Sequence, residues 1–164
     1  MAEHKLVALN DEVLDRTAHD WRNQAGVEEF EVELSALFEA CRTNHGFAQA
    51  LVNSETGKTG ALLEVVDTPF GKDGAVSKLL KVWVSPEYWA SNNPDRKQLI
   101  EVYLWAYLQV ISSGMYNRRD TVKIYGRTDL MLDVLHSLKD VWNTDVNTNW
   151  TASIAGRWLV LMKD

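Results

Sequence analysis

The chain has 164 residues, 46% of them hydrophobic, and a formal charge of −6. This length fits one domain, and the even spread of apolar residues excludes a disordered chain. We therefore expect a single globular domain over residues 1–164. The negative charge argues against general nucleic-acid binding and against a polybasic membrane surface, although it leaves room for a local basic patch.

Cys41 is the only cysteine, so no disulfide can form within the chain, which fits a reducing compartment. It falls on the apolar stripe of a predicted helix, which favours a small core residue over a reactive thiol. The N-terminus shows no secretory signal, and no stretch approaches about 18 consecutive apolar residues. We expect a protein made in a cytoplasm and not inserted into a membrane.

The first third of the chain predicts a short strand followed by two helices. Residues 5–9 (KLVAL) read as the strand, and Asn10 or Asp11 then offers a helix N-cap. Apolar residues recur at helical spacing up to Gly26. A second helix follows and ends near 44–46, and its apolar stripe is formed by Phe30, Leu34, Leu37, Phe38 and Cys41.

The middle of the chain predicts three antiparallel strands. The apolar runs 47–52 and 61–66 flank a polar, glycine-containing loop, which is typical of a β-hairpin. A second glycine-containing turn, 69–74, leads into a longer strand over 75–84. Alternating side chains on that strand fall on two faces. Residues 47–84 are thus expected to form a meander.

The last half predicts helix, strand, helix and a closing hairpin. Asn93 can cap a helix that has Pro94 at its first position and runs from about 95 to 112, stopping at Gly114. A strand over 121–125 follows, and then a helix that starts at Thr128 or Asp129. The tail then turns back on itself near Ala155 and Gly156.

The strand–helix–strand run between 75 and 125 requires a parallel pair joined by a crossover. The predicted class is therefore α/β (α+β), with a mixed, mostly antiparallel sheet and helices on both faces. The predicted order is β-α-α-β-β-β-α-β-α-β-β.

This order of elements resembles the GNAT acyltransferase superfamily over nearly the whole chain. Two local stretches carry the resemblance: VWVSPEYW (82–89), similar to the family's fourth strand and the segment after it, and 122–142, similar to its fifth strand and following helix. The resemblance implies a site for acetyl-CoA, with a glycine-rich loop holding the pyrophosphate through backbone amides.

The loop that should hold the pyrophosphate departs from the family pattern. The family has Arg/Gln-x-x-Gly-x-Gly/Ala here, whereas the two glycine positions fall near Asn92 and Pro94. Proline lacks an N–H group, and Asp95 would oppose a dianion. Charge could instead come from basic side chains. The residues that the resemblance would place around the cofactor are Val84, Trp89, Asn92, Asn93, Arg96 and Lys97.

The family's general acid also lacks a counterpart. Many members carry a Tyr seven residues along the last helix to protonate the leaving thiolate. Counted from Thr128 that position is Leu135, which cannot donate a proton. If the protein is active, His136 and Glu64 are the candidate catalytic residues. Otherwise His136 is a surface or boundary histidine, and Glu64 is an outward-facing charge on a half-exposed strand.

Other patterns give weaker indications: a Ser-His-Asp arrangement stays open, although no nucleophile elbow is present. The Gly-Lys-Thr that begins at Gly57 lacks the preceding glycine of a P-loop, because that position is Val52, and it lies in a predicted hairpin. The four histidines are scattered, and no metal-ligand spacing is present, so no metal is expected.

Two groups of residues are candidate contacts for a protein partner. Tyr88 and Trp89 are aromatic residues in a polar loop, either an anchor for a partner or rings that cap the sheet edge. Arg118 and Arg119 form a basic cluster with nearby Lys123 and Arg127, which is either a solvated loop or a contact for a phosphate or an acidic partner.

The sequence is compatible with two main functions and a weaker third. The first is a GNAT-like fold that has lost acyl transfer, needs no cofactor and serves as a structural or protein-interaction module. In this it is similar to GNAT-like virion and accessory proteins of short-tailed bacteriophages, found in the host cytoplasm or the virion. The second is an acetyl-CoA-dependent N-acyltransferase with a divergent loop. A weaker third is a phage inhibitor of a host protein. The oligomeric state stays open.

Overall fold

The computed structural model describes residues 3–24, 27–44, 46–72, 74–90, 95–145 and 148–164. The chain forms two compact units, the first comprising 1–64 with 82–106 and the second 65–81 with 107–164. Two strands and one helix run from one unit into the other.

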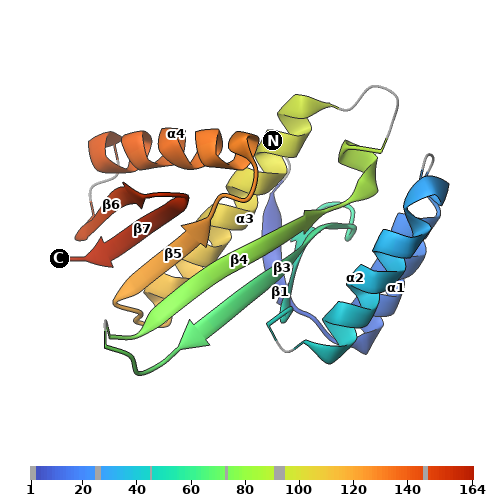
Figure 1. Cartoon of the computed structure of the whole chain (residues 1–164), viewed down its shortest axis with the longest axis horizontal. Helices are drawn as coiled ribbons and strands as arrows, with labels where there is room; N and C mark the ends of the chain where they lie inside the picture. The colour runs from blue at the N-terminus through green and yellow to red at the C-terminus, as the bar shows by residue number, and fades with distance from the viewer. Residues whose placement is uncertain (1–2, 25–26, 45, 73, 91–94, 146–147) are drawn as a thin grey trace. The chain divides into compact units, whose positions relative to one another are not determined.

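The observed elements follow the predicted order (Figure 1). Short 3-10 turns, η1 (Glu28–Phe30) and η2 (Pro86–Tyr88), precede α2 and follow β4. The strands and helices are β1 (His4–Ala8), α1 (Asp11–Arg22), α2 (Glu31–Thr43), β2 (Gln49–Asn53), β3 (Thr59–Thr68), β4 (Val76–Val84), α3 (Arg96–Tyr116), β5 (Thr121–Tyr125), α4 (Asp129–Asp145), β6 (Trp150–Ala155) and β7 (Trp158–Lys163).

The strands form one seven-stranded sheet in the order β1-β2-β3-β4-β5-β7-β6. β4 and β5 are parallel, from Val76 opposite Thr121 to Leu79 opposite Ile124. The pairs β1/β2, β2/β3, β5/β7 and β6/β7 are antiparallel. The predicted class, a mixed and mostly antiparallel sheet with helices, is confirmed.

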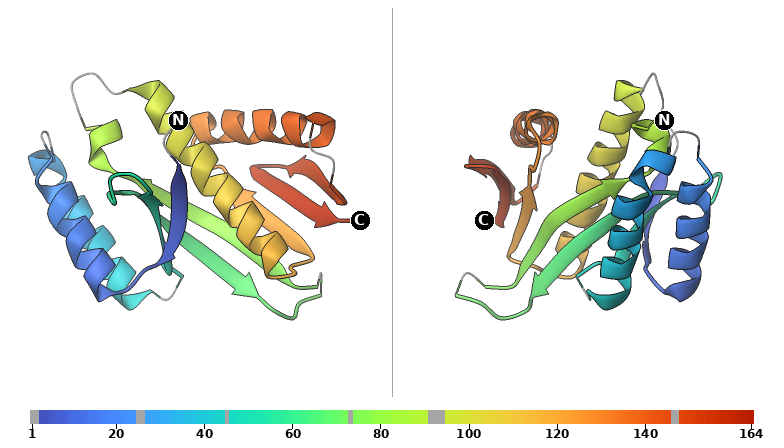
Figure 2. Two further views of the ribbon diagram at one scale, coloured as in Figure 1. Left: turned by 180° about the vertical axis from the view of Figure 1, so that it is seen from behind. Right: turned by 45° about the vertical axis from the view of Figure 1, so that its right-hand side comes forward.

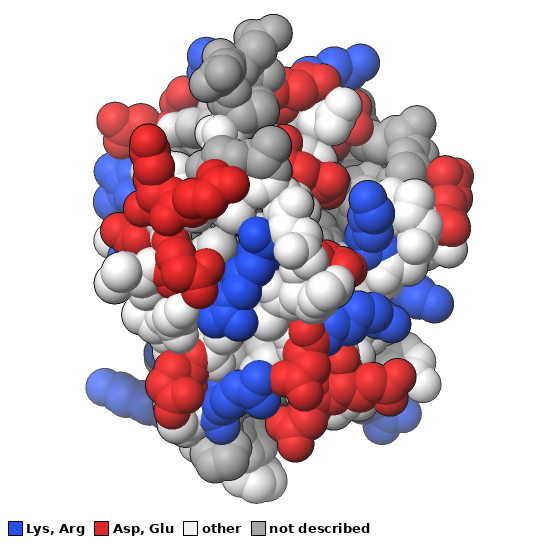
Figure 3. Space-filling model, turned by 90° about the vertical axis from the view of Figure 1, so that its right-hand side faces the viewer, with Lys and Arg blue, Asp and Glu red and all other residues white. Residues whose placement is uncertain are grey.

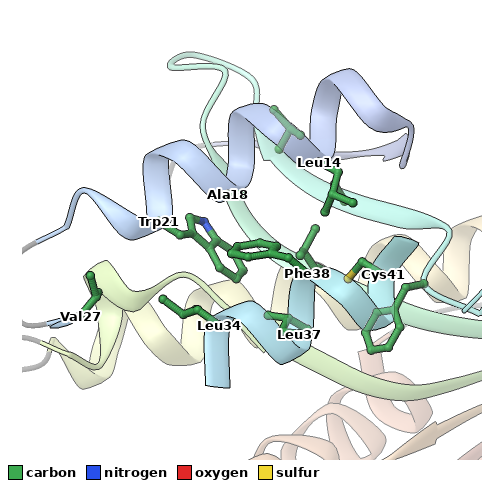
Figure 4. Close-up of a cluster of buried hydrophobic side chains, with 12 residues drawn as sticks. Leu14, Ala18, Trp21, Val27, Leu34, Leu37, Phe38 and Cys41 are labelled. Carbon is green, nitrogen blue, oxygen red and sulfur yellow. The ribbon is translucent and has the colours of Figure 1, made fainter. Parts of the chain in front are cut away.

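In the first unit, α1 and α2 pack on one face of β2 and β3. The Asn10 side chain caps α1 by accepting the N–H of Val13 at 2.9 Å, as predicted. Beneath the helices, apolar side chains form a buried cluster in which Trp21 is 1% exposed (Figure 4). The Trp21 indole N–H also donates to the carbonyl of Thr59 at 3.0 Å, which ties α1 to β3.

The opposite face of the same strands meets α3. In the β1/β2 register His4 pairs with Asn53, and the next pair is Lys5 with Val52. Val52 belongs to the buried cluster beneath α1 and α2, here called the α1/α2 cluster. Because neighbouring residues of a strand point to opposite faces, His4 lies on the other face. The His4 ring packs against Trp105 of α3, with ring centroids 6.1 Å apart. The first unit therefore has helices on both faces of its strands.

In the second unit, the end of α3 lies close against β5 (Figures 1 and 2). A Cβ added at Gly114 would come within 3.0 Å of the Val122 side chain. The prediction that the helix stops at Gly114 is wrong, because α3 continues to Tyr116. This glycine serves a close approach between helix and strand and does not end the helix.

The start of α3 also differs from the prediction. The predicted cap Asn93 and first residue Pro94 lie outside the described residues. The Asp95 side chain accepts two backbone N–H groups of the first turn instead. At the start of α4 the Thr128 hydroxyl accepts the N–H of Met131, in agreement with one of the two predicted starts.

The edge strand β6 is bonded to side chains of α4. The Asn143 amide donates to the carbonyl of Ala152 at 2.8 Å and accepts its N–H at 3.0 Å. The Trp142 indole donates to the carbonyl of Trp150 at 3.1 Å. These bonds fix the last hairpin, which turns at Gly156 as predicted; the φ of Gly156 is 61°.

Candidate functional site

The N-terminus of α3 is where the GNAT resemblance would place a pyrophosphate. Here one Asp95 carboxylate oxygen accepts the N–H of Lys97 at 3.0 Å and that of Gln98 at 3.2 Å. Free amides at a helix N-terminus attract anions because of the helix dipole. The carboxylate of Asp95 therefore already accepts two of the first N–H groups of α3.

The other predicted cofactor residues in this unit are spread over strand, turn and helix. Val84 is buried, and its carbonyl accepts the indole N–H of Trp89 at 2.9 Å. Arg96 and Lys97 are exposed on the first turn of α3. Asn92 and Asn93 lie outside the described residues.

Trp89 is held against the protein. Its ring meets Phe30 edge-on, with centroids 4.8 Å apart, and is only half-buried. The ring thus covers the end of β4, an interior strand of the sheet, while part of it stays exposed. Burial raises the pKa of the neighbouring Tyr88, and the charge of Glu87 adds to this, so Tyr88 stays a neutral phenol.

The position at which the GNAT resemblance would place a general acid lies in the core. Leu135 is fully buried, and its side chain packs near Gly126, where an added Cβ would lie 3.2 Å from Leu135 Cδ1. His136, one step further along α4, is exposed. A group at position 135 faces the interior of the second unit, whereas His136 faces water.

Glu64 differs from the expectation of an outward-facing charge. It is 8% exposed, and one of its oxygens lies 3.5 Å from the Asn44 amide. The strand is buried on both faces at this point, which periodicity alone could not reveal. Glu64 belongs to the first unit and His136 to the second.

Cys41 is a core residue, as predicted. Burial is the largest effect on its thiol and raises the pKa to about 11, partly opposed by Arg42. Its side chain belongs to the α1/α2 cluster (Figure 4). A thiol held protonated is a poor nucleophile.

Arg118 and Arg119 differ in their surroundings. Arg119 pairs with Asp67 at 3.2 Å and is mostly buried, whereas Arg118 is exposed with φ of 55°. These two residues belong to the second unit, and Tyr88 and Trp89 to the first.

Two exposed aromatic residues were missed by the sequence reasoning. Phe70, in the β3–β4 turn, is 93% exposed, and Tyr116, at the end of α3, is 88% exposed. The two turns adjoin, because Ala75 and Asp120 exchange backbone and carboxylate hydrogen bonds at 2.8 Å. The sequence did offer a signal for an exposed ring at Phe70, a bulky apolar residue in a glycine-containing turn. We name Phe70, Tyr116 and Arg118 the turn cluster.

Charges over α1 and α2 are mixed. Figure 3 shows acidic and basic side chains interspersed on the side of the molecule where these helices lie. Arg22 pairs with Glu31 at 3.1 Å, and Arg42 pairs with Asp15. These exposed pairs leave an excess of negative charge, because residues 11–43 contain nine Asp and Glu against three Arg.

No group of three or more His, Cys, Asp or Glu residues in the described part of the chain could hold a metal ion. None of the described helices is long and apolar enough to cross a membrane.

No family model matches the chain, and no curated protein matches it by sequence. Among solved structures, AtaTR bound with AcCoA is similar, with 12% identity and a TM-score of 0.51, covering 96% of this chain and 92% of that one. A possible acetyltransferase from Clostridium difficile 630 has 18% identity and a TM-score of 0.47, covering 93% and 99%. A GNAT-family acetyltransferase from Streptococcus agalactiae 2603 has 10% identity and a TM-score of 0.44, covering 98% and 94%.

Identities this low establish a common fold only. Together with the order of elements and the parallel β4/β5 pair, the similarity shows that the chain has the GNAT fold.

Proposed function

We propose that this protein is a GNAT-fold module that does not transfer acyl groups and that binds a protein partner. The observation that carries the proposal is Asp95, whose carboxylate takes the first N–H groups of α3. A diphosphate at these amides would have to displace that carboxylate or accept its repulsion. Leu135, fully buried at the position of the family's acid, supports the same conclusion.

The turn cluster is the proposed contact for the partner. Phe70 and Tyr116 each leave nearly the whole side chain in water, and Arg118, two residues after Tyr116, adds an exposed positive charge. Aromatic residues and arginine are enriched in the central contacts of protein interfaces. Tyr88 and Trp89 in the first unit stay a second proposed contact. The resemblance to virion and accessory proteins of short-tailed phages indicates which partners to test first.

Thermal melting with and without acetyl-CoA tests the loss of the cofactor site. We expect no shift at millimolar acetyl-CoA. Binding at a hundred times the dissociation constant would stabilise the protein by ~2.7 kcal/mol. For a chain of this size that is a rise of roughly 5–10 °C. A rise of that size would contradict the proposal.

Capture of partners tests the turn cluster. The variant F70S/Y116S removes two exposed rings and should fold as the natural chain does. We expect a partner captured from host extract or virion proteins by the natural chain to be lost with this variant. V32S is the matched control, because Val32 is also 80% exposed but lies on α2. Equal loss with V32S would show that the capture is nonspecific.

A second candidate function is acetyl-CoA-dependent N-acylation. The similarity to AtaTR bound with AcCoA favours it. The melting experiment separates the two functions, and Glu64 and His136 are then the residues to substitute first.

We also propose that residues 1–164 form a single folding domain. β3, β4 and α3 each contribute residues to both compact units, so neither unit has a complete set of elements of its own.

A further inference from the structure

One face of the second unit's strands is lined by two rows of side chains. In the register, Lys78 on β4 lies opposite Lys123 on β5. Two residues further along β5, Tyr125 lies opposite Trp158 on β7. All four are partly exposed. The opposite face is fully buried, through Leu79, Val122, Ile124, Leu159 and Leu161.

The first row concentrates positive charge. Lys78 and Lys123 are direct neighbours on adjacent strands, and Lys72 joins them around a hollow of about 170 Å³. Like charges directly opposite each other in a sheet are destabilising. Within the described part of the chain, no ion pair joins these three lysines to a carboxylate, whereas Arg119 and Arg157 in the same unit have such partners. An anion in this hollow would relieve the repulsion.

The second row offers an aromatic surface. The Tyr125 and Trp158 rings lie 4.9 Å apart between centroids, tilted by 51°. With Leu80, Lys81 and Arg127 they line a hollow of about 300 Å³. Residues two apart on a strand are separated by roughly 6.5 Å, so the aromatic row lies about one nucleotide's length from the lysine row. Planar aromatic ligands stack on rings presented by a sheet in this way.

The charge of the chain is divided unevenly between its units. The second unit contains ten Lys and Arg against eight Asp and Glu, a net charge of +2. The first contains seven against fifteen, a net charge of −8. The overall charge of −6 therefore does not describe the surface on which the lysine row lies.

We propose that this face binds a nucleoside phosphate, with the phosphate between Lys72, Lys78 and Lys123 and the base against Trp158 and Tyr125. The shared chemistry is one charged phosphate and one planar base. It is supplied either by a free nucleotide or by one nucleotide of a single strand. This inference stands apart from the proposed function, because it concerns other residues and needs no acyl carrier.

Fluorescence anisotropy with a labelled oligo-dT of about ten nucleotides, at low salt, tests the proposal. Adenosine monophosphate and inorganic phosphate serve as unlabelled competitors. K78Q/K123Q should weaken binding at least tenfold and flatten the salt dependence, because fewer counterions are released. W158L should weaken binding by roughly fivefold or more while leaving the salt dependence unchanged, because stacking is lost but charge is not.

The control variant is K163Q, which removes one charge from an exposed lysine on β7 and should bind as the natural chain does. Competition by the monophosphate at similar concentrations would identify a free-nucleotide site, and competition by oligonucleotide alone would identify a single-strand site. Both results support the proposal. Absence of binding to the labelled oligo-dT, or equal weakening by K163Q, would overturn it. Melting of each variant without ligand verifies the fold.

Discussion

Gly114→Ala tests why a glycine lies inside α3. In a helix interior, alanine is favoured over glycine by about 1 kcal/mol, so helix propensity alone predicts a more stable protein. Here the added methyl group would come within 3.0 Å of Val122, a fully buried residue of β5. Forcing a methyl group into a packed contact costs about 1–3 kcal/mol, which exceeds the gain in propensity.

We therefore expect Gly114→Ala to lower the free energy of unfolding by about 1 kcal/mol on balance. The melting temperature should fall by roughly 2–4 °C, measured by circular dichroism. Val122→Ala removes the methyl group of Val122 that the added Cβ of residue 114 would contact. The double variant G114A/V122A should thus be more stable than the sum of the two single changes by about 2 kcal/mol, the whole of the relieved clash. A higher melting temperature for Gly114→Ala, or strict additivity in the double variant, would refute the close approach.

Two further predictions concern Cys41 and the domain organisation. Because the Cys41 thiol has a folded pKa of about 11 against an ordinary value of 9.0, the folded state holds this proton more tightly. Its contribution to stability is then constant below pH 9 and is lost as the pH rises from 9 to 11, a slope that Cys41→Ala should remove. Ellman's reagent should likewise react slowly at pH 8 until the protein is unfolded, and rapid native labelling would count against burial. Urea unfolding followed by far-UV circular dichroism and by tryptophan fluorescence should give one coincident transition, because both units share β3, β4 and α3. Two separate transitions would mean that the units fold independently.

Local chemistry made much of the fold predictable. The cap at Asn10, the strand over 121–125 and the turn at Gly156 each depend on a few neighbouring residues. The helix end at Gly114 was mispredicted, because a glycine that ends a helix and one that admits a close neighbour look alike in sequence. Only the position of Val122, on another element, distinguishes them.

The candidate site was less predictable for a similar reason. Leu135 could be identified as a poor acid from its residue type alone. The role of Asp95 as a cap could not be assigned, since its carboxylate might equally have faced solvent. Glu64 was expected to be exposed because its strand alternates, but burial depends on what covers each face. The rows at Lys78 and Tyr125 depend on the register between strands, which distant pairings set.

The bonds between α4 and β6 have a consequence for self-association. An edge strand with open backbone groups is a template on which another chain can polymerise. On β6, Asn143 engages both backbone groups of Ala152, and Trp142 engages the carbonyl of Trp150. Asn143→Ala would uncover this strand and should favour fibrils or swapped dimers at high concentration, even where the fold itself survives.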